Sequence, residues 1–151
     1  MCIKIKKAIT SEIKSLYSQG FRTFWVGCGM GVDTWAAEIV IELKQQKEYK
    51  DIRLCAAVPF PSFQEKFDVR QQARLQNILR KCDEQIVISD TEFPRAYRIR
   101  NEYIVRKSDC ILAVYNRNSK FYTDIDIVVD YALKTKLPII YIHPDTAAIS
   151  K

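Results

Sequence analysis

At residues 23–34 the sequence reads TFWVGCGMGVDT, a short apolar run followed by a glycine-rich turn and the start of an apolar-periodic segment. The turn holds Gly27, Gly29 and Gly31, three of only four glycines in the chain. Glycines permit a sharp turn and a close backbone approach to an anion, and the positive end of a following helix favours phosphate. The G-x-G-x-G spacing is not the dinucleotide-binding fingerprint, and no P-loop Lys-Ser or Lys-Thr pair follows it. The stretch therefore predicts a strand, turn and helix that either cradle a nucleotide phosphate or only form a tight connection.

The rest of the chain continues this alternation of strand and helix. Apolar residues at helical spacing between Ile5 and Tyr17 predict a first helix that stops at Gly20. Ser62 and Glu65 have capping-box spacing ahead of a further helix that carries apolar residues between 67 and 79. Additional helices are predicted around residues 36–43, 96–107 and 124–134, and strands at 23–28, 52–58, 85–89, 110–115 and 138–142.

The predicted strands indicate the fold class. Residues 111–114 and 139–142 are continuous apolar runs, typical of a parallel sheet that helices cover on both faces. The sequence predicts one α/β domain over residues 1–151, a Rossmann-like three-layer sandwich with a mostly parallel sheet of about five strands. Ligands of such folds bind at loops after the carboxyl ends of the strands. Those loops are the glycine turn and residues 59–64, 90–94 and 116–124.

Composition excludes several classes of site. The 151 residues are 48% hydrophobic, with neither an apolar run long enough to span a membrane nor a charged-then-apolar leader, so we expect a cytoplasmic protein without a membrane partner. Five cysteines lack C-x-x-C spacing and are predicted to be reduced and mostly buried. With His143 the only histidine, no zinc cluster and no nucleophile–base pair is indicated.

The net charge of +6 suggests an anionic partner, but the basic residues are spread over several predicted helices. Their densest cluster lies on or just before one helix and comprises Arg95, Arg98, Arg100, Arg106 and Lys107. This cluster suits the phosphate of a small ligand or of a polynucleotide.

Four segments carry a resemblance to a known group of proteins. They are GCGMGVDTWAAE from Gly27, Pro59-Phe60 with Gln64, RNEYIVRKSDCILAVY from Arg100, and VDYALKTKLPIIYI from Val129. Together they resemble the SLOG superfamily (SMF/DprA-LOG) and, within it, the YpsA-like branch. The superfamily also includes the DNA-processing protein A core and the LONELY GUY phosphoribohydrolases. The resemblance implies a Rossmann-like fold that binds a nucleotide or a derivative such as ADP-ribose or NAD, with no cofactor assigned beyond that ligand.

The resemblance also implies a set of site residues. The phosphate loop would comprise Gly27, Cys28, Gly29, Met30 and Gly31, with Asp33 holding the turn. Asp33 could equally be only the N-cap of the helix.

Three further positions have alternative interpretations. Arg100 and Asn101 match an Arg-Asn pair that would reach phosphate, ribose or base, although a surface salt bridge would also account for the arginine. Trp35 could stack on a base, but a large aromatic residue at helical spacing favours the core.

The sequence departs from the family pattern at two places. Relatives begin with a strand and a Thr-Gly-His-Arg-Pro-like loop, whereas this chain starts with the helix that would follow them. We therefore expect an exposed edge or a vacant central slot in the sheet, which pairing, covering or homo-oligomerisation would manage. After Tyr115 relatives carry Gly-Gly-Thr, and here residues 116–124 lack glycine, so that Ser119, Lys120 or Thr123 would have to supply side-chain contacts.

These observations support three functional hypotheses. The first is a sensor or regulatory protein that binds a small nucleotide ligand without catalysis. The second is a nucleoside-phosphate N-glycosidase of the phosphoribohydrolase type, for which Glu38 is the only placed carboxylate, since the Pro-Gly-Gly-x-Gly-Thr-x-x-Glu motif does not occur. The third, ranked last, is single-stranded DNA binding, which the basic charge favours but no aromatic-basic ladder supports.

Overall fold

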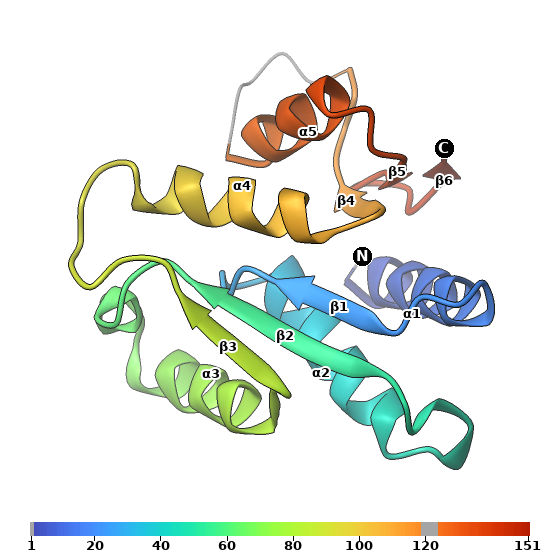
Figure 1. Cartoon of the computed structure of the whole chain (residues 1–151). Coiled ribbons are helices and arrows are strands. Elements are labelled where there is room, and N and C mark those ends of the chain that lie inside the picture. The colour runs from blue at the N-terminus through green and yellow to red at the C-terminus, as the bar shows by residue number, and fades with distance from the viewer. Residues whose placement is uncertain (1, 119–123) are drawn as a thin grey trace.

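A computed structural model describes residues 2–118 and 124–151 of the chain, which fold as an α/β protein (Figure 1). Its α-helices are α1 (Cys2–Ser18), α2 (Val32–Lys44), α3 (Val69–Lys81), α4 (Ala96–Lys107) and α5 (Asp124–Lys134). Short 3₁₀ helices span Lys47–Tyr49 (η1) and Phe63–Lys66 (η2). The strands are β1 (Thr23–Val26), β2 (Arg53–Val58), β3 (Glu84–Val87), β4 (Ile111–Val114), β5 (Ile139–Ile142) and β6 (Ile149–Ser150).

The strands form two sheets where the sequence predicted one. In the first sheet β1, β2 and β3 are parallel, in that order. In the second sheet β4 pairs parallel with β5, and β5 pairs antiparallel with β6, a two-residue strand that the sequence did not predict. The expectation of one sheet of about five strands is therefore corrected: within the described residues, the parallel order breaks between β1 and β4.

Helices bridge this break. Helix α1 packs against α2 and against β5, whereas α4 packs against β1, β2 and α5 (Figure 1). The two sheets are thus held together by helix packing, with no described backbone ladder between β1 and β4.

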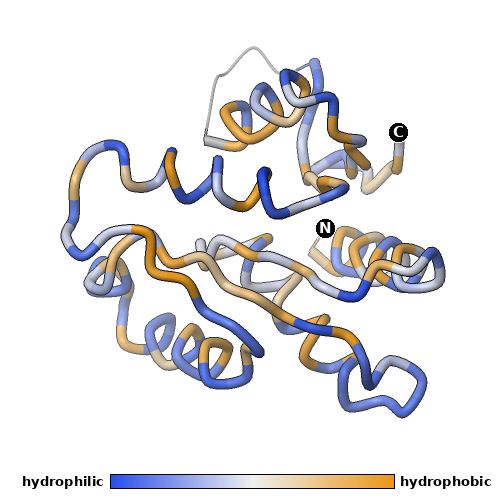
Figure 2. Tube along the Cα trace, viewed as in Figure 1, coloured by the Kyte–Doolittle hydropathy of each residue, from blue (hydrophilic) through white to orange (hydrophobic). Residues whose placement is uncertain are grey.

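The larger core lies between the first sheet and helices α1 to α3. Helices there alternate apolar and polar residues along their length, as Figure 2 shows for α1 and α3. Phe60, Ile9, Ile52 and Leu54 are among its fully buried side chains. Trp35 packs against this core, which supports its structural interpretation.

The capping box lies later than the sequence pattern suggested. Ser62 begins η2 and makes no side-chain capping bond. Instead, Asp68 caps α3: its Oδ1 accepts from the Gln71 backbone N–H at 2.8 Å, and Gln71 Oε1 accepts from the Asp68 N–H at 3.3 Å. The prediction of a box at Ser62 and Glu65 is therefore wrong.

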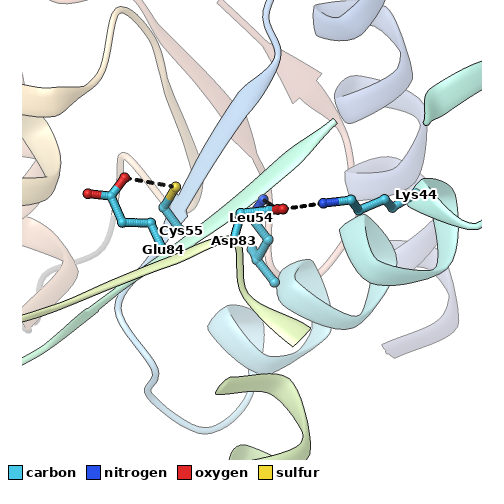
Figure 3. A network of polar contacts seen from close by, with 5 residues as sticks. All are labelled: Lys44, Leu54, Cys55, Asp83 and Glu84. Atoms are coloured by element: carbon cyan, nitrogen blue, oxygen red, sulfur yellow. Dashed lines mark hydrogen bonds and ion pairs between the residues drawn. The ribbon is translucent and has the colours of Figure 1, made fainter. Parts of the chain in front are cut away.

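The start of the β2–β3 ladder is fixed by Asp83 (Figure 3). Its backbone N–H donates to Leu54 O at 2.8 Å, and its Oδ2 accepts from the Leu54 N–H at 2.9 Å. Lys44 on α2 pairs with the other carboxylate oxygen. Beside it, Cys55 Sγ lies 3.9 Å from Glu84 Oε2. One side chain thus ties β2, β3 and α2 together.

Candidate functional site

The glycine turn connects β1 to α2 in a conformation that few residues adopt. Gly31, the N-cap of α2, has φ 90°, and Cys28 has φ 67° although it carries a side chain. Two side chains hold the turn: Asp33 Oδ2 accepts from the Gly29 N–H at 3.1 Å, and Thr34 Oγ1 donates to Gly29 O at 3.0 Å. Asp33 lies in the first turn of α2, so the alternative that it is the N-cap residue is wrong, whereas it does contact the turn as the resemblance implied.

Arg100 reaches this turn from α4. Its Nη1 donates to Gly27 O, and its Nε donates to Asn101 Oδ1 at 2.8 Å. The guanidinium also lies over the ring of Tyr97, 5.6 Å from its centroid. Its partners are a backbone carbonyl and an amide, so the alternative of a surface salt bridge does not describe it. Arg100 and the glycine turn are brought together from positions 73 residues apart.

A cavity of about 840 Å³ opens beside the turn. Most of the predicted phosphate-site residues line it, namely Gly27, Gly29, Met30, Asp33, Arg100 and Asn101. The rest of its wall comes from β1, β4 and helices α1, α2, α4 and α5. The size falls within the ~300–1,000 Å³ that small-molecule sites occupy.

Cys28 and Gly31 are not among the residues that line this cavity. Cys28 is buried, and burial, reinforced by the Asp33 carboxylate, raises the pKa of its thiol to about 12 despite the opposing effect of Arg100. A buried thiol with so high a pKa stays protonated at neutral pH, so it is a poor nucleophile. No group of His, Cys, Asp or Glu in the described residues could hold a metal ion.

The candidate catalytic carboxylate lies elsewhere. Glu38 on α2 accepts from Arg74 of α3, with Oε2 2.9 Å from Nε, and it is not among the cavity-lining residues. Thr123, predicted to contact the ligand, lies outside the described residues.

The apolar wall of the cavity is the part of the site that sequence reasoning did not single out. It includes Ile9, Ile13 and Leu16 of α1, whose helical spacing signals only a buried face.

With this geometry in view, comparison with known proteins places the chain in a family. The model of the YspA SLOG family matches residues 1–147. The chain belongs to this SLOG family. The UPF0398 protein of Halalkalibacterium halodurans is 34% identical over 116 residues, covering 76% of this chain and 60% of that protein. The UPF0398 protein of Bacillus cereus strain G9842 is 31% identical over 114 residues, covering 74% of this chain and 61% of that protein.

This SLOG chain therefore spans about three fifths of the length of the curated relatives it matches. No described helix in it is long and apolar enough to cross a membrane.

Proposed function

We propose that this SLOG chain binds a nucleotide or a nucleotide derivative, such as ADP-ribose or NAD, as a sensor or regulatory protein without catalysis. The observation that carries the proposal is the meeting of three features at one end of a single cavity: the glycine turn, the first turn of α2, and Arg100. We also propose that the α/β fold described above is a Rossmann-like layered sandwich.

The local contacts support one position for a bound anion. The Gly29 N–H already donates to Asp33, so it is not the main donor. The backbone N–H groups of the first residues of a helix have no intrahelical partner, and in α2 these are residues 32–34. Arg100 Nε and Nη1 are engaged, and no described residue forms a hydrogen bond with its Nη2. We therefore place the phosphate between the start of α2 and Arg100 Nη2, where a fixed guanidinium fork and the helix dipole act together.

The position of Glu38 supports binding without turnover. Glycosidic cleavage needs a carboxylate beside the sugar, and Glu38 is engaged by Arg74 away from the cavity. Asp33 lines the cavity, but its Oδ2 holds the Gly29 N–H. Glu38, the carboxylate that the sequence offered for the enzyme alternative, is therefore not placed to act on a ligand in the cavity.

The experiment measures ligand binding by native mass spectrometry and calorimetry with AMP, ADP-ribose and NAD, followed by a product check. The expected result is one intact ligand bound per chain and a loss of at least tenfold in affinity for Arg100→Ala, since a charge-assisted contact contributes about 1.5–3 kcal/mol. Arg74→Ala is the matched control, because it removes an arginine from an ion pair outside the cavity. Circular dichroism of both variants checks that the fold is intact.

Two results would contradict the proposal. If the wild type and Arg100→Ala bound the ligand with equal affinity, the ligand would not bind at this end of the cavity. Release of a free base would favour the phosphoribohydrolase hypothesis over the sensor hypothesis. The variant Glu38→Gln would then test whether the Glu38 carboxylate takes part in the cleavage.

A further inference from the structure

Lys66 lies at the same edge of the first sheet as the glycine turn. Strands β1, β2 and β3 are parallel neighbours, so the segments that follow them meet at one edge. The glycine turn follows β1, and Lys66 ends η2, which follows β2. Glu92, whose Oε1 lies 2.8 Å from Lys66 Nζ, is between β3 and α4. This ion pair therefore joins the two loops that neighbour the candidate ligand site.

Two cations lie beside the ring of Tyr97. Lys66 Nζ is 5.7 Å from the ring centroid, and Arg100 Cζ is 5.6 Å from the same point. Lys66 Nζ is also 5.9 Å from the ring centroid of Phe60, which packs edge-on against Tyr97. Phe60 is fully buried in the larger core. A pair of rings fixed by the core thus keeps the ammonium of Lys66 near the guanidinium of Arg100.

The ion pair that holds Lys66 is easily exchanged. The side chains of Lys66 and Glu92 are 56% and 54% exposed. Exposed ion pairs contribute little to stability, because water and salt screen both charges. A phosphate group carries more negative charge than a carboxylate and offers three acceptor oxygens. The flexible four-carbon stem of lysine allows the ammonium to turn from Glu92 to such a group.

We propose that Lys66 leaves Glu92 to bind a second phosphate group of the ligand, and so selects nucleoside diphosphates and their derivatives over monophosphates. The inference rests on the proposed function, which puts the first phosphate at Arg100. Because both cations lie beside one ring, adjacent phosphate groups of a single ligand can reach both. Lys66 is then the residue that reads the number of phosphate groups, whereas Arg100 binds either class of ligand.

A purely structural role for the ion pair makes a different prediction. If the pair only fastened the loops after β2 and β3, removal of either partner would loosen both loops and change ligand affinity in the same direction. If Lys66 exchanges partners, the two removals have opposite effects. Loss of the ammonium weakens binding of a diphosphate, whereas loss of the Glu92 carboxylate frees the ammonium and strengthens it.

The test compares ADP with AMP by calorimetry, because the two ligands differ by one phosphate group. We expect the wild type to bind ADP at least about tenfold more tightly than AMP. Lys66→Met, which keeps the apolar stem, should weaken ADP binding at least about tenfold and change AMP binding by less than about twofold. Glu92→Gln should strengthen ADP binding by about two- to fivefold. The matched control is Lys44→Met, which removes a lysine from an ion pair with Asp83 at the opposite end of β3.

Three results would overturn the inference. They are equal affinities of the wild type for ADP and AMP, an unchanged ADP affinity in Lys66→Met, and a change in the same direction for Lys66→Met and Glu92→Gln. A loss of ADP affinity in Lys44→Met as large as in Lys66→Met would also overturn it, because the effect would then come from the net charge of the chain.

Inorganic pyrophosphate separates this inference from the proposed function. If both nucleotides bind through Arg100 and Lys66→Met binds ADP like the wild type, the proposed function is supported and the role of Lys66 is wrong. If pyrophosphate binds and requires Lys66 while neither nucleotide binds, the site for two phosphate groups is supported and the proposed function is wrong. If the folded chain binds none of the three ligands, both are wrong.

Discussion

Replacing Asp83 by alanine tests how the β2–β3 ladder begins. The change removes the acceptor of the Leu54 N–H and the partner of Lys44, while the backbone bond from Asp83 N–H to Leu54 O is retained (Figure 3). Leu54 is 1% exposed, so its N–H would lose its partner in a buried position. An unsatisfied buried donor costs about 1–3 kcal/mol, and a partly exposed ion pair adds about 0–1 kcal/mol. We expect Asp83→Ala to lower the free energy of unfolding by about 2–3 kcal/mol.

Two matched variants separate the hydrogen-bond and ion-pair contributions to this loss of stability. Asp83→Asn keeps an oxygen that can accept from Leu54 and loses the charge, so we expect a loss of about 1 kcal/mol. Lys44→Met removes only the ion pair, whose side chains are 36% and 21% exposed, and should cost less than about 1 kcal/mol. Urea unfolding at pH 7, followed by circular dichroism, measures all three changes.

The contribution of Asp83 should depend on pH in a definite direction. Burial raises the pKa of its carboxyl, but the bonds from Lys44 and the Leu54 N–H outweigh burial and hold the pKa below the ordinary 3.8. A carboxyl whose pKa is lowered in the folded state adds stability above its unfolded pKa and loses it as the pH falls through the folded value. The stability difference between the wild type and Asp83→Ala should therefore be complete at pH 7 and shrink below about pH 4.

A free energy of unfolding for Asp83→Ala within about 0.5 kcal/mol of the wild-type value at pH 7 would contradict this account of Asp83. A loss for Lys44→Met as large as that for Asp83→Ala would also contradict it, because the ion pair would then matter more than the buried N–H.

Three further changes test other parts of the structure. Lys136 is exposed with φ 60°, so Lys136→Gly should raise the free energy of unfolding by about 0.5–1 kcal/mol in thermal melts, and a lower melting temperature would contradict this. Thr34→Val keeps the buried shape but removes the donor to Gly29 O, and should cost about 1 kcal/mol in the same assay. Cys28, with its pKa raised to about 12, should resist maleimide in the native chain at pH 7 while exposed Cys2 reacts, as peptide mass spectra will show; equal labelling would refute its burial.

The local structure was largely predictable because its signals are local. The helices over 96–107 and 124–134 have the predicted bounds, and the five predicted strands occur with ends shifted by one or two residues. Where two local signals compete, the sequence alone did not decide: Ser62 and Asp68 each precede a Glu or Gln by three residues, and the chain caps α3 with Asp68. The turn at Gly31 was predictable because few other residues adopt its positive φ.

Strand pairing and long-range side-chain contacts were not predictable in the same way. The contact from Arg100 to Gly27 spans 73 residues, and no spacing rule encodes it. The prediction of one sheet was wrong because alternation of strands and helices does not establish which strands are neighbours. Apolar runs at 111–114 and 139–142 indicate burial on both faces, and both occur in the second sheet.

Arg100 couples the glycine turn to β1. Gly27 follows directly on β1, and its carbonyl accepts from Arg100, so the strand also positions the guanidinium. The proposed phosphate site therefore depends on a contact between two elements that lie far apart in the sequence, and this contact exists only in the folded chain.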